Sequence, residues 1–172
     1  MKRVLVIGCS GAGKSTLAKA IADRTSLPLI HLDNEFWHPG WVETPADEWP
    51  SIVEQLAARD SWVMDGNYSG TFPFRMPRAD TIILVERPRW LCLLRAMWRS
   101  AKFYGRVRPD LAEGCPERFS LDFYKWIWDF PNRSKKKMGE AMATIGAHAT
   151  QITLASDREA HAFLQTIDPK ID

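Results

Sequence analysis

Short apolar runs alternate with longer amphipathic stretches along this chain, which is the pattern of a parallel α/β sheet. Residues 4–7 are apolar throughout and end at Gly8, so they predict a buried central strand. The other short runs predict strands at 28–32, 61–64, 81–85 and 152–154. We therefore expect a doubly wound α/β domain in which a five-stranded parallel sheet is flanked by helices.

Apolar residues recur at helical spacing between these runs. One helix is predicted from Gly13 to about Arg24, and another after Thr44, which fits an N-cap ahead of a proline at the first helical position. A third helix begins near Pro88, and the last begins at a capping box headed by Ser156. The apolar face of the helix after Pro88 consists of Leu91, Leu94, Met97, Trp98 and Ala101.

The composition is that of a soluble globular protein, with 172 residues, 45% hydrophobic and 26% charged. No apolar run approaches the ~20 residues of a membrane span, and the apolar run before Gly8 is too short for a secretory signal. Three separated cysteines and four histidines offer neither a disulfide framework nor the spacing of a transition-metal site. We expect one cytoplasmic domain over residues 1–172. A net charge of +2 argues against a dedicated nucleic-acid binder.

Residues 8–15, Gly-Cys-Ser-Gly-Ala-Gly-Lys-Ser, match the phosphate-binding motif G-x-x-x-x-G-K-[ST] at every position. Glycines let consecutive backbone N–H groups point inward as an anion nest, and the following helix adds its positive end. Lys14 is predicted to bridge the β- and γ-phosphates of ATP, and the Ser15 hydroxyl to ligate Mg²⁺. The predicted nucleotide contacts are Gly8, Ser10, Gly11, Ala12, Gly13, Lys14, Ser15 and Thr16.

Two acids follow predicted strands, where ligands of open α/β sheets collect. Asp65 is assigned to the Mg²⁺ shell through water, and Asp33 to the substrate, as an acceptor of its hydroxyl proton. The two roles could be exchanged. The alternative is that each is a turn or cap residue, since Asp is common after strands.

A cationic stripe lies beside the apolar face of the helix after Pro88 and continues beyond that helix. Its members are Arg95, Arg99, Lys102, Arg106 and Arg108. The last two fall in the irregular stretch 105–119, whose length in so small a domain is typical of a functional lid. Such cations would neutralise a transferring phosphoryl group; the alternative is a solvated helix face. A second basic run, 133–137, fits a solvated helix start or a further contact to phosphate or nucleic acid.

Several segments together resemble the bacterial DNA topology modulation (FlaR-type) proteins, over about residues 1–165. The segments are 8–15, 31–41, 65–68, 87–91, 108–110 and 114–118. That family is similar in turn to adenylate kinases and other small-molecule kinases. The resemblance implies a P-loop fold with strand order 2-3-1-4-5, and a lid-proximal arginine pair at Arg95 and Arg99. Asp65-Gly66 lies where adenylate kinases have Asp-Gly-Phe-Pro-Arg.

The chain departs from adenylate kinases in two places. Asn67-Tyr68 replaces Phe-Pro, and a Trp/His/Pro/Gly stretch follows Asp33 in place of the segment that holds a nucleoside monophosphate. These departures argue against AMP as the acceptor. The pair His38-Pro39 is similar to one in gluconate kinases.

The chain contains eight tryptophans, none of them before residue 37. Trp49, Trp62 and Trp98 are predicted to pack in the core. Trp37 and Trp41 follow Asp33 closely and are predicted to wall an acceptor pocket, because ligand sites combine aromatic walls with few polar groups. The predicted substrate contacts are Asp33, Trp37, Trp41, Asn67 and Tyr68.

These features predict a Mg²⁺-dependent kinase that transfers the γ-phosphoryl group of ATP to a small acceptor. In it Asp33 orients the acceptor, and Arg95, Arg99, Arg106 and Arg108 close over the transferring group beside Lys14. One alternative is a nucleotide-dependent regulator that binds DNA or protein, in keeping with the family name. Another alternative is a nucleic-acid end kinase, and only the basic run at residues 133–137 supports it.

Overall fold

The structure is a computed structural model that describes residues 1–108 and 111–167. Five parallel strands form its main sheet in the order β2-β5-β1-β6-β7, which the resemblance had implied. The strands are β1 (Arg3–Gly8), β2 (Leu29–His31), β5 (Trp62–Asp65), β6 (Thr81–Val85) and β7 (Thr150–Leu154). The predicted α/β fold class is therefore confirmed. Pro109 and Asp110 of the predicted lid lie outside the described residues.

The central position of β1 follows from its composition. Val4, Leu5, Val6 and Ile7 have no exposed surface, which suits a strand covered by helices on both faces. Leu5 pairs with Met64 of β5 on one side and with Ile82 of β6 on the other. Because all five strands are parallel, their carboxyl ends reach the same edge of the sheet.

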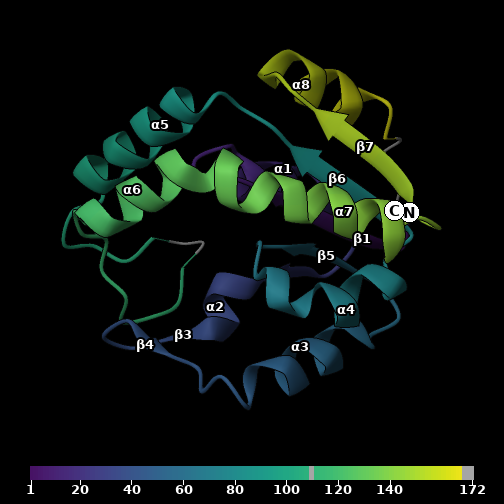
Figure 1. The fold of residues 1–172 in the computed structure, drawn as a ribbon, viewed down its shortest axis with the longest axis horizontal. Coiled ribbons are helices and arrows are strands. Elements are labelled where there is room, and N and C mark those ends of the chain that lie inside the picture. The colour runs from purple at the N-terminus through teal and green to yellow at the C-terminus, as the bar shows by residue number, and fades with distance from the viewer. Residues whose placement is uncertain (109–110, 168–172) are drawn as a thin grey trace.

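Helices cover both faces of the sheet (Figure 1). They are α1 (Lys14–Thr25), α3 (Trp49–Ala57), α4 (Phe72–Arg75), α5 (Arg89–Lys102), α6 (Leu121–Phe130), α7 (Lys136–Thr144) and α8 (Asp157–Gln165). A π-helical turn, Pro131–Lys135, joins α6 to α7, so the two run on in one line across the sheet. The 133–137 run therefore lies within a continuous helical segment, where Lys135 pairs with Glu86 at 3.0 Å.

The segment between β2 and α3 differs from the prediction. β2 ends at His31, and Asp33 lies in the first turn of a short helix, α2 (Leu32–Phe36). A small antiparallel hairpin follows, formed by β3 (Trp37–His38) and β4 (Val42–Glu43). Thr44 does not cap α3, because its hydroxyl donates to the Phe36 carbonyl at 2.8 Å and so closes the hairpin.

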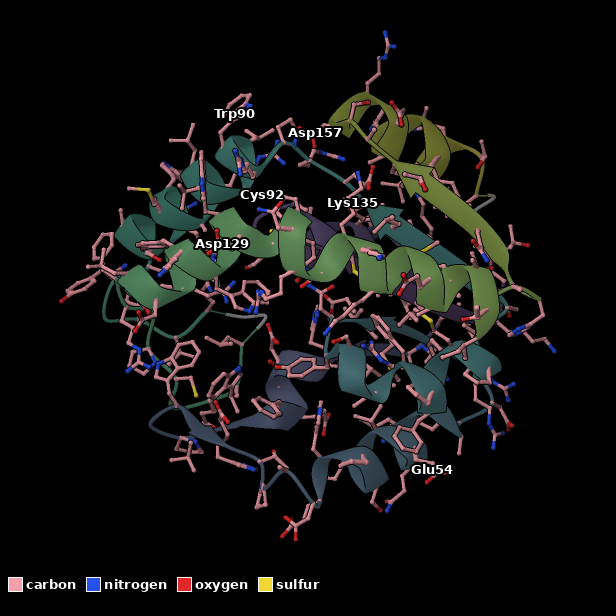
Figure 2. The ribbon with its side chains drawn as sticks, viewed as in Figure 1. Glu54, Trp90, Cys92, Asp129, Lys135 and Asp157 are labelled. Atoms are coloured by element: carbon pink, nitrogen blue, oxygen red, sulfur yellow. The ribbon has the colours of Figure 1, made fainter. Side chains whose placement is uncertain are left out.

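The face of α5 that turns toward the rest of the domain also differs from the prediction. Trp98 is 65% exposed and Leu94 57%, whereas the buried positions are the small residues Cys92, Ala96 and Ser100. Trp90 points outward from α5 in Figure 2, away from the sheet. Trp98 was therefore wrongly predicted to lie in the core. No helix within residues 1–108 or 111–167 is long and apolar enough to cross a membrane.

Trp98 is exposed because α5 lies very close to the loop after β1. A Cβ atom on Gly11 would lie 2.2 Å from the carbonyl oxygen of Cys92, so only small side chains fit on the inner face of the helix. The larger apolar side chains are left on the outer face. Trp49 and Trp62, in contrast, are buried as predicted.

We predict that Trp62→Ala lowers the free energy of unfolding by about 3–5 kcal/mol, because it empties a fully buried position. The matched substitution Trp98→Ala should cost less than about 1 kcal/mol, since that side chain lies mostly in solvent. Urea unfolding of both variants measures the difference. Equal losses would show that the outer face of α5 is covered in solution.

Candidate functional site

The carboxyl ends of β1, β2 and β5 open into a cavity of about 1250 Å³. The loop after β1, the hairpin and the 105–119 stretch all contribute to its walls. The predicted site residues on its wall are Ser10, Gly11, Ala12, Gly13, Lys14, Ser15, Thr16, Asp33, Trp37, Trp41, Asp65, Asn67, Tyr68, Arg95, Arg99 and Arg108. The fold thus brings residues from distant parts of the chain to one place.

Residues 8–15 lie between β1 and α1, as the motif requires. Two of the glycines are demanded by their surroundings, because a Cβ on Gly8 would lie 2.2 Å from the Val85 carbonyl oxygen and one on Gly11 equally close to that of Cys92. Both also have positive φ, at 145° and 80°. The Lys14 ammonium donates to the Cys9 carbonyl at 3.0 Å and so arches back over the loop.

Asp65 joins the loop to the neighbouring strands. Its Oδ2 accepts a hydrogen bond from the Ser15 hydroxyl at 2.7 Å, and its Oδ1 lies 2.5 Å from Nδ1 of His31. Sequence reasoning missed His31, although it ends β2 and pairs in register with Asp65 across the two strands. The carboxylate is 4% exposed, so both contacts hold it in a fixed orientation.

The Ser15 hydroxyl and the Asp65 carboxylate suit Mg²⁺, which prefers oxygen ligands and keeps several waters. Among the residues that the structure describes, no group of three His, Cys, Asp or Glu side chains could hold a metal ion.

Asn67 ties the loop after β5 to the start of the phosphate loop. Its side-chain oxygen accepts from the Gly8 N–H at 2.9 Å, and its amide nitrogen donates to the Gly8 carbonyl at 2.5 Å. Both polar atoms of the side chain are thus used to position backbone. Asn67 therefore supports the phosphate loop as well as lining the cavity.

Arg75 on α4 is fully buried, and no motif or pattern in the sequence singles it out. Its guanidinium donates to the carbonyl of Gly66 at 2.8 Å, to the carbonyls of Asn67 and Tyr68, and to the Thr71 hydroxyl at 2.9 Å. Burial lowers the pKa of Arg75 to about 9. The arginine thus fixes the backbone of the loop that carries Asn67 and Tyr68.

Asp33 and Tyr68 form a pair on the cavity wall. The phenol donates to Oδ1 of Asp33 at 2.7 Å, and its ring packs against Phe36 and Trp49 at 4.9 and 5.0 Å between ring centres. Burial raises the pKa of the Tyr68 phenol, with the Asp33 charge adding to the effect. Tyr68 therefore keeps its proton and acts as the donor. Its φ of 32° is a strained conformation of the kind that clusters at functional sites.

The hairpin and the lid stretch pack on one another. Trp37 and Trp41 lie 5.4 Å apart between ring centres and contact a small apolar cluster formed by Leu111, Ala112 and Cys115. Trp41 donates to the Pro116 carbonyl at 2.9 Å and has a positive φ of 63°. The two predicted acceptor walls therefore pack on residues 111–116, a contact that sequence analysis did not anticipate.

The predicted arginines have different partners. Arg95 pairs with Asp157 at 2.5 Å, and that hydrogen bond, with others from Arg87, lowers the pKa of the Asp157 carboxyl. Arg99 and Arg108 both pair with Glu117, at 3.6 and 2.7 Å. Arg106 is exposed and lies outside the set of described residues that line the cavity.

Comparison with known proteins identifies the fold. The structure matches a shikimate kinase from Acinetobacter baumannii, solved with shikimate, with a TM-score of 0.64 and 16% identity over 97% of this chain and 90% of that one. A shikimate kinase from Bacteroides thetaiotaomicron matches with a TM-score of 0.55 and 19% identity over 96% and 95% of the two chains. This chain shares the fold of these two enzymes.

A gluconokinase from Sinorhizobium meliloti 1021 shares that fold, with a TM-score of 0.53 and 17% identity over 96% of this chain and 92% of that chain. In sequence, the chain is 26% identical over 147 residues to the uncharacterized protein YqaC of Bacillus subtilis strain 168, covering 82% of this chain and 79% of YqaC. No family model matches the chain.

We predict that Arg75→Met lowers the free energy of unfolding by about 3 kcal/mol or more, because it leaves several buried acceptors without a donor at about 1–3 kcal/mol each. Arg78→Met, an exposed arginine three positions along, is the matched control and should change stability by about 0.5 kcal/mol or less. Chemical unfolding measures both. Similar losses would contradict the role given to Arg75.

Proposed function

We propose that this protein is a kinase that transfers the γ-phosphoryl group of ATP to a hydroxyl or phosphate group of a small acceptor. The observation that carries the proposal is the shared cavity, in which the phosphate loop with its Ser15–Asp65 contact faces the same space as the Asp33–Tyr68 pair. The fold, which the chain shares with shikimate kinases and a gluconokinase, supports it.

The phosphate loop would bind the nucleotide. Backbone N–H groups of residues 8–15 suit phosphate oxygens, and Lys14 is placed to exchange its contact with the Cys9 carbonyl for the β- and γ-phosphates. Ser15 and, through water, Asp65 would hold Mg²⁺, which when bound offsets the negative charge of the phosphates. Thr16 follows Ser15 on the wall of the cavity and is the last of the proposed nucleotide contacts.

The acceptor would lie between Asp33 and the aromatic walls. Oδ1 of Asp33 accepts a hydrogen bond from the Tyr68 hydroxyl, so the remaining oxygen is left to orient an acceptor hydroxyl and to take its proton during transfer. Trp37 and Trp41 exclude water from that side. Asn67 acts mainly through its hold on Gly8.

Cations would neutralise the transferring group from the lid side. Arg95, Arg99 and Arg108 line the cavity, and guanidinium groups match the geometry of phosphoryl oxygens. Arg106 would reach the site only if the lid moves, since it lies on the surface here.

The finer identity of the enzyme rests on the resemblance to FlaR-type proteins and, through them, to adenylate kinases. Because of that resemblance, a nucleotide is one of the acceptors to be tested. The alternative function is a nucleotide-dependent regulator of DNA topology. The comparisons lend the alternative no support. Three free, buried cysteines suit a reducing compartment, so we place the enzyme in the cytoplasm.

We predict ATP- and acceptor-dependent ADP release with at least one member of a panel of hydroxy acids, sugars, nucleosides and nucleoside monophosphates. Lys14→Ala should lower kcat by about 10²–10³-fold, because it removes a charge from the transferring phosphate. Lys19→Ala on the same helix is the control and should be unchanged, since Lys19 pairs with Asp23 at the surface.

No turnover above that of Lys14→Ala with any acceptor would overturn the kinase proposal. DNA binding that weakens steeply with added salt, in the absence of such turnover, would instead favour the regulator.

We predict that Asp33→Asn lowers kcat by about 10²–10⁴-fold while the Kd for ATP stays within about twofold, because general-base catalysis is lost and the phosphate loop is untouched. Glu35→Gln removes an exposed carboxylate from the same short helix and serves as the control. Steady-state kinetics and calorimetric titration measure the two quantities. Loss of ATP affinity in Asp33→Asn would assign Asp33 to the nucleotide instead.

A further inference from the structure

Glu117 is a buried carboxylate at the end of the lid stretch, 5% exposed, that sequence analysis did not single out. Its Oε1 accepts a hydrogen bond from the Ser100 hydroxyl of α5 at 3.0 Å. Its Oε2 lies 2.7 Å from Nε of Arg108 and 3.6 Å from Nε of Arg99. One side chain therefore links α5 to the lid through three partners.

The backbone of Glu117 is held independently of its carboxylate. Its N–H donates to the Arg106 carbonyl at 2.9 Å, and its carbonyl accepts from the Gly105 N–H at 2.9 Å. These bonds close the stretch between 105 and 117 at its base. A change at the Glu117 carboxylate therefore leaves the closure of the lid stretch in place.

The charges explain why a carboxylate is needed there. The side chains of Arg99 and Arg108 are 23% and 9% exposed, so two positive groups lie close together where water screens them poorly. A carboxylate between them offsets their repulsion. Because its Oε2 lies near Nε of both arginines, it attracts the two guanidinium groups toward the same point.

Both arginines line the cavity that contains Lys14 and the phosphate loop. A cation stabilises a transferring phosphoryl group only when it is held in place before the reaction, because a displacement of about 1 Å can cost about 10²-fold in rate. The contacts of Glu117 with Arg99, Arg108 and Ser100 supply that hold.

We propose that Glu117 is a positioning residue that holds Arg99 and Arg108 toward the γ-phosphoryl group of bound ATP. This inference rests on the proposed kinase function and deepens it. Glu117 itself lines the cavity, and in this proposal it acts through the two arginines rather than on the nucleotide or the acceptor. The γ-phosphoryl group, and not the rest of the nucleotide, is the part of ATP that should depend on it.

The first test is Glu117→Gln, which keeps the size of the side chain and a hydrogen-bonding group for Ser100 but removes the charge between the arginines. We expect kcat to fall by about 10²-fold and KM for ATP to rise by about tenfold, because the two arginines also contact the terminal phosphate of the bound nucleotide. Glu113→Gln, an exposed acid in the same stretch, is the matched control and should leave both constants unchanged.

The second test needs no acceptor. Calorimetric titration compares ADP with a non-hydrolysable ATP analogue, and the wild-type protein should bind the analogue about tenfold more tightly because two oriented arginines face its terminal phosphate. In Glu117→Gln we expect this preference to fall toward onefold while the Kd for ADP is unchanged. A role confined to folding would weaken both ligands together or lower the fraction of binding-competent protein.

A third variant keeps the proposal testable if Glu117→Gln folds poorly. Ser100→Ala removes only the hydrogen bond to Oε1, and it should lower kcat and the preference for the ATP analogue by about three- to tenfold. In a background in which Arg99 and Arg108 are both replaced by Ala, either change should have little further effect, because the groups that Glu117 positions are gone.

The outcomes separate this inference from the kinase proposal. Measurable turnover with unchanged kcat and unchanged preference in Glu117→Gln and Ser100→Ala would overturn the role of Glu117 and leave the kinase intact. Absence of turnover with every acceptor, together with a lost preference for the ATP analogue, would overturn the kinase and retain the hold of Glu117 on the γ-phosphate arginines.

Discussion

The close approach of the phosphate loop to β6 and α5 is the constraint on which the rest of this structure depends. Gly8 lies against the Val85 carbonyl and Gly11 against that of Cys92, with no room for a Cβ at either place. The first contact fixes where the loop leaves the central strand. The contact of Gly11 with Cys92 brings α5 so close that its inner face carries only small side chains, and the large apolar side chains lie on its outer face. The same approach brings Arg95 and Arg99 to the cavity.

A second set of contacts secures the loop from the side of β5, and it is built from polar groups. Arg75 holds the backbone that carries Asn67, and Asn67 in turn holds both backbone groups of Gly8. Asp65 reaches Ser15 from the same strand. A buried arginine is costly in isolation, but here its donors meet carbonyls that the turn after β5 would otherwise leave unpaired. The acids and amides of the site are therefore held in place before any ligand arrives.

The sequence was sufficient for features that depend on local pattern and poor for those that depend on contacts between distant segments. The phosphate loop, strand β6 and the irregular lid stretch followed from motif, hydrophobic runs and turn residues. The buried face of α5 could not be predicted in this way. Amphipathic periodicity shows which side of a helix is apolar, but it does not show that a loop packs closely against the other side. His31, Arg75 and Glu117 carry no local signal: each matters because of a partner that folding brings to it.

The side of the cavity that we propose for the acceptor also depends on contacts between distant segments. Trp41 of the hairpin is bonded to Pro116, and Cys115 donates to the His38 carbonyl at 3.1 Å, so hairpin and lid form one packed unit. The size of the space beside Asp33 and the placement of Arg108 are consequently set together, through Glu117 and the cluster at Leu111. An acceptor of different shape would require matched changes in both segments. Neither segment alone therefore specifies the acceptor, which explains why a local motif in the hairpin was not enough to name it.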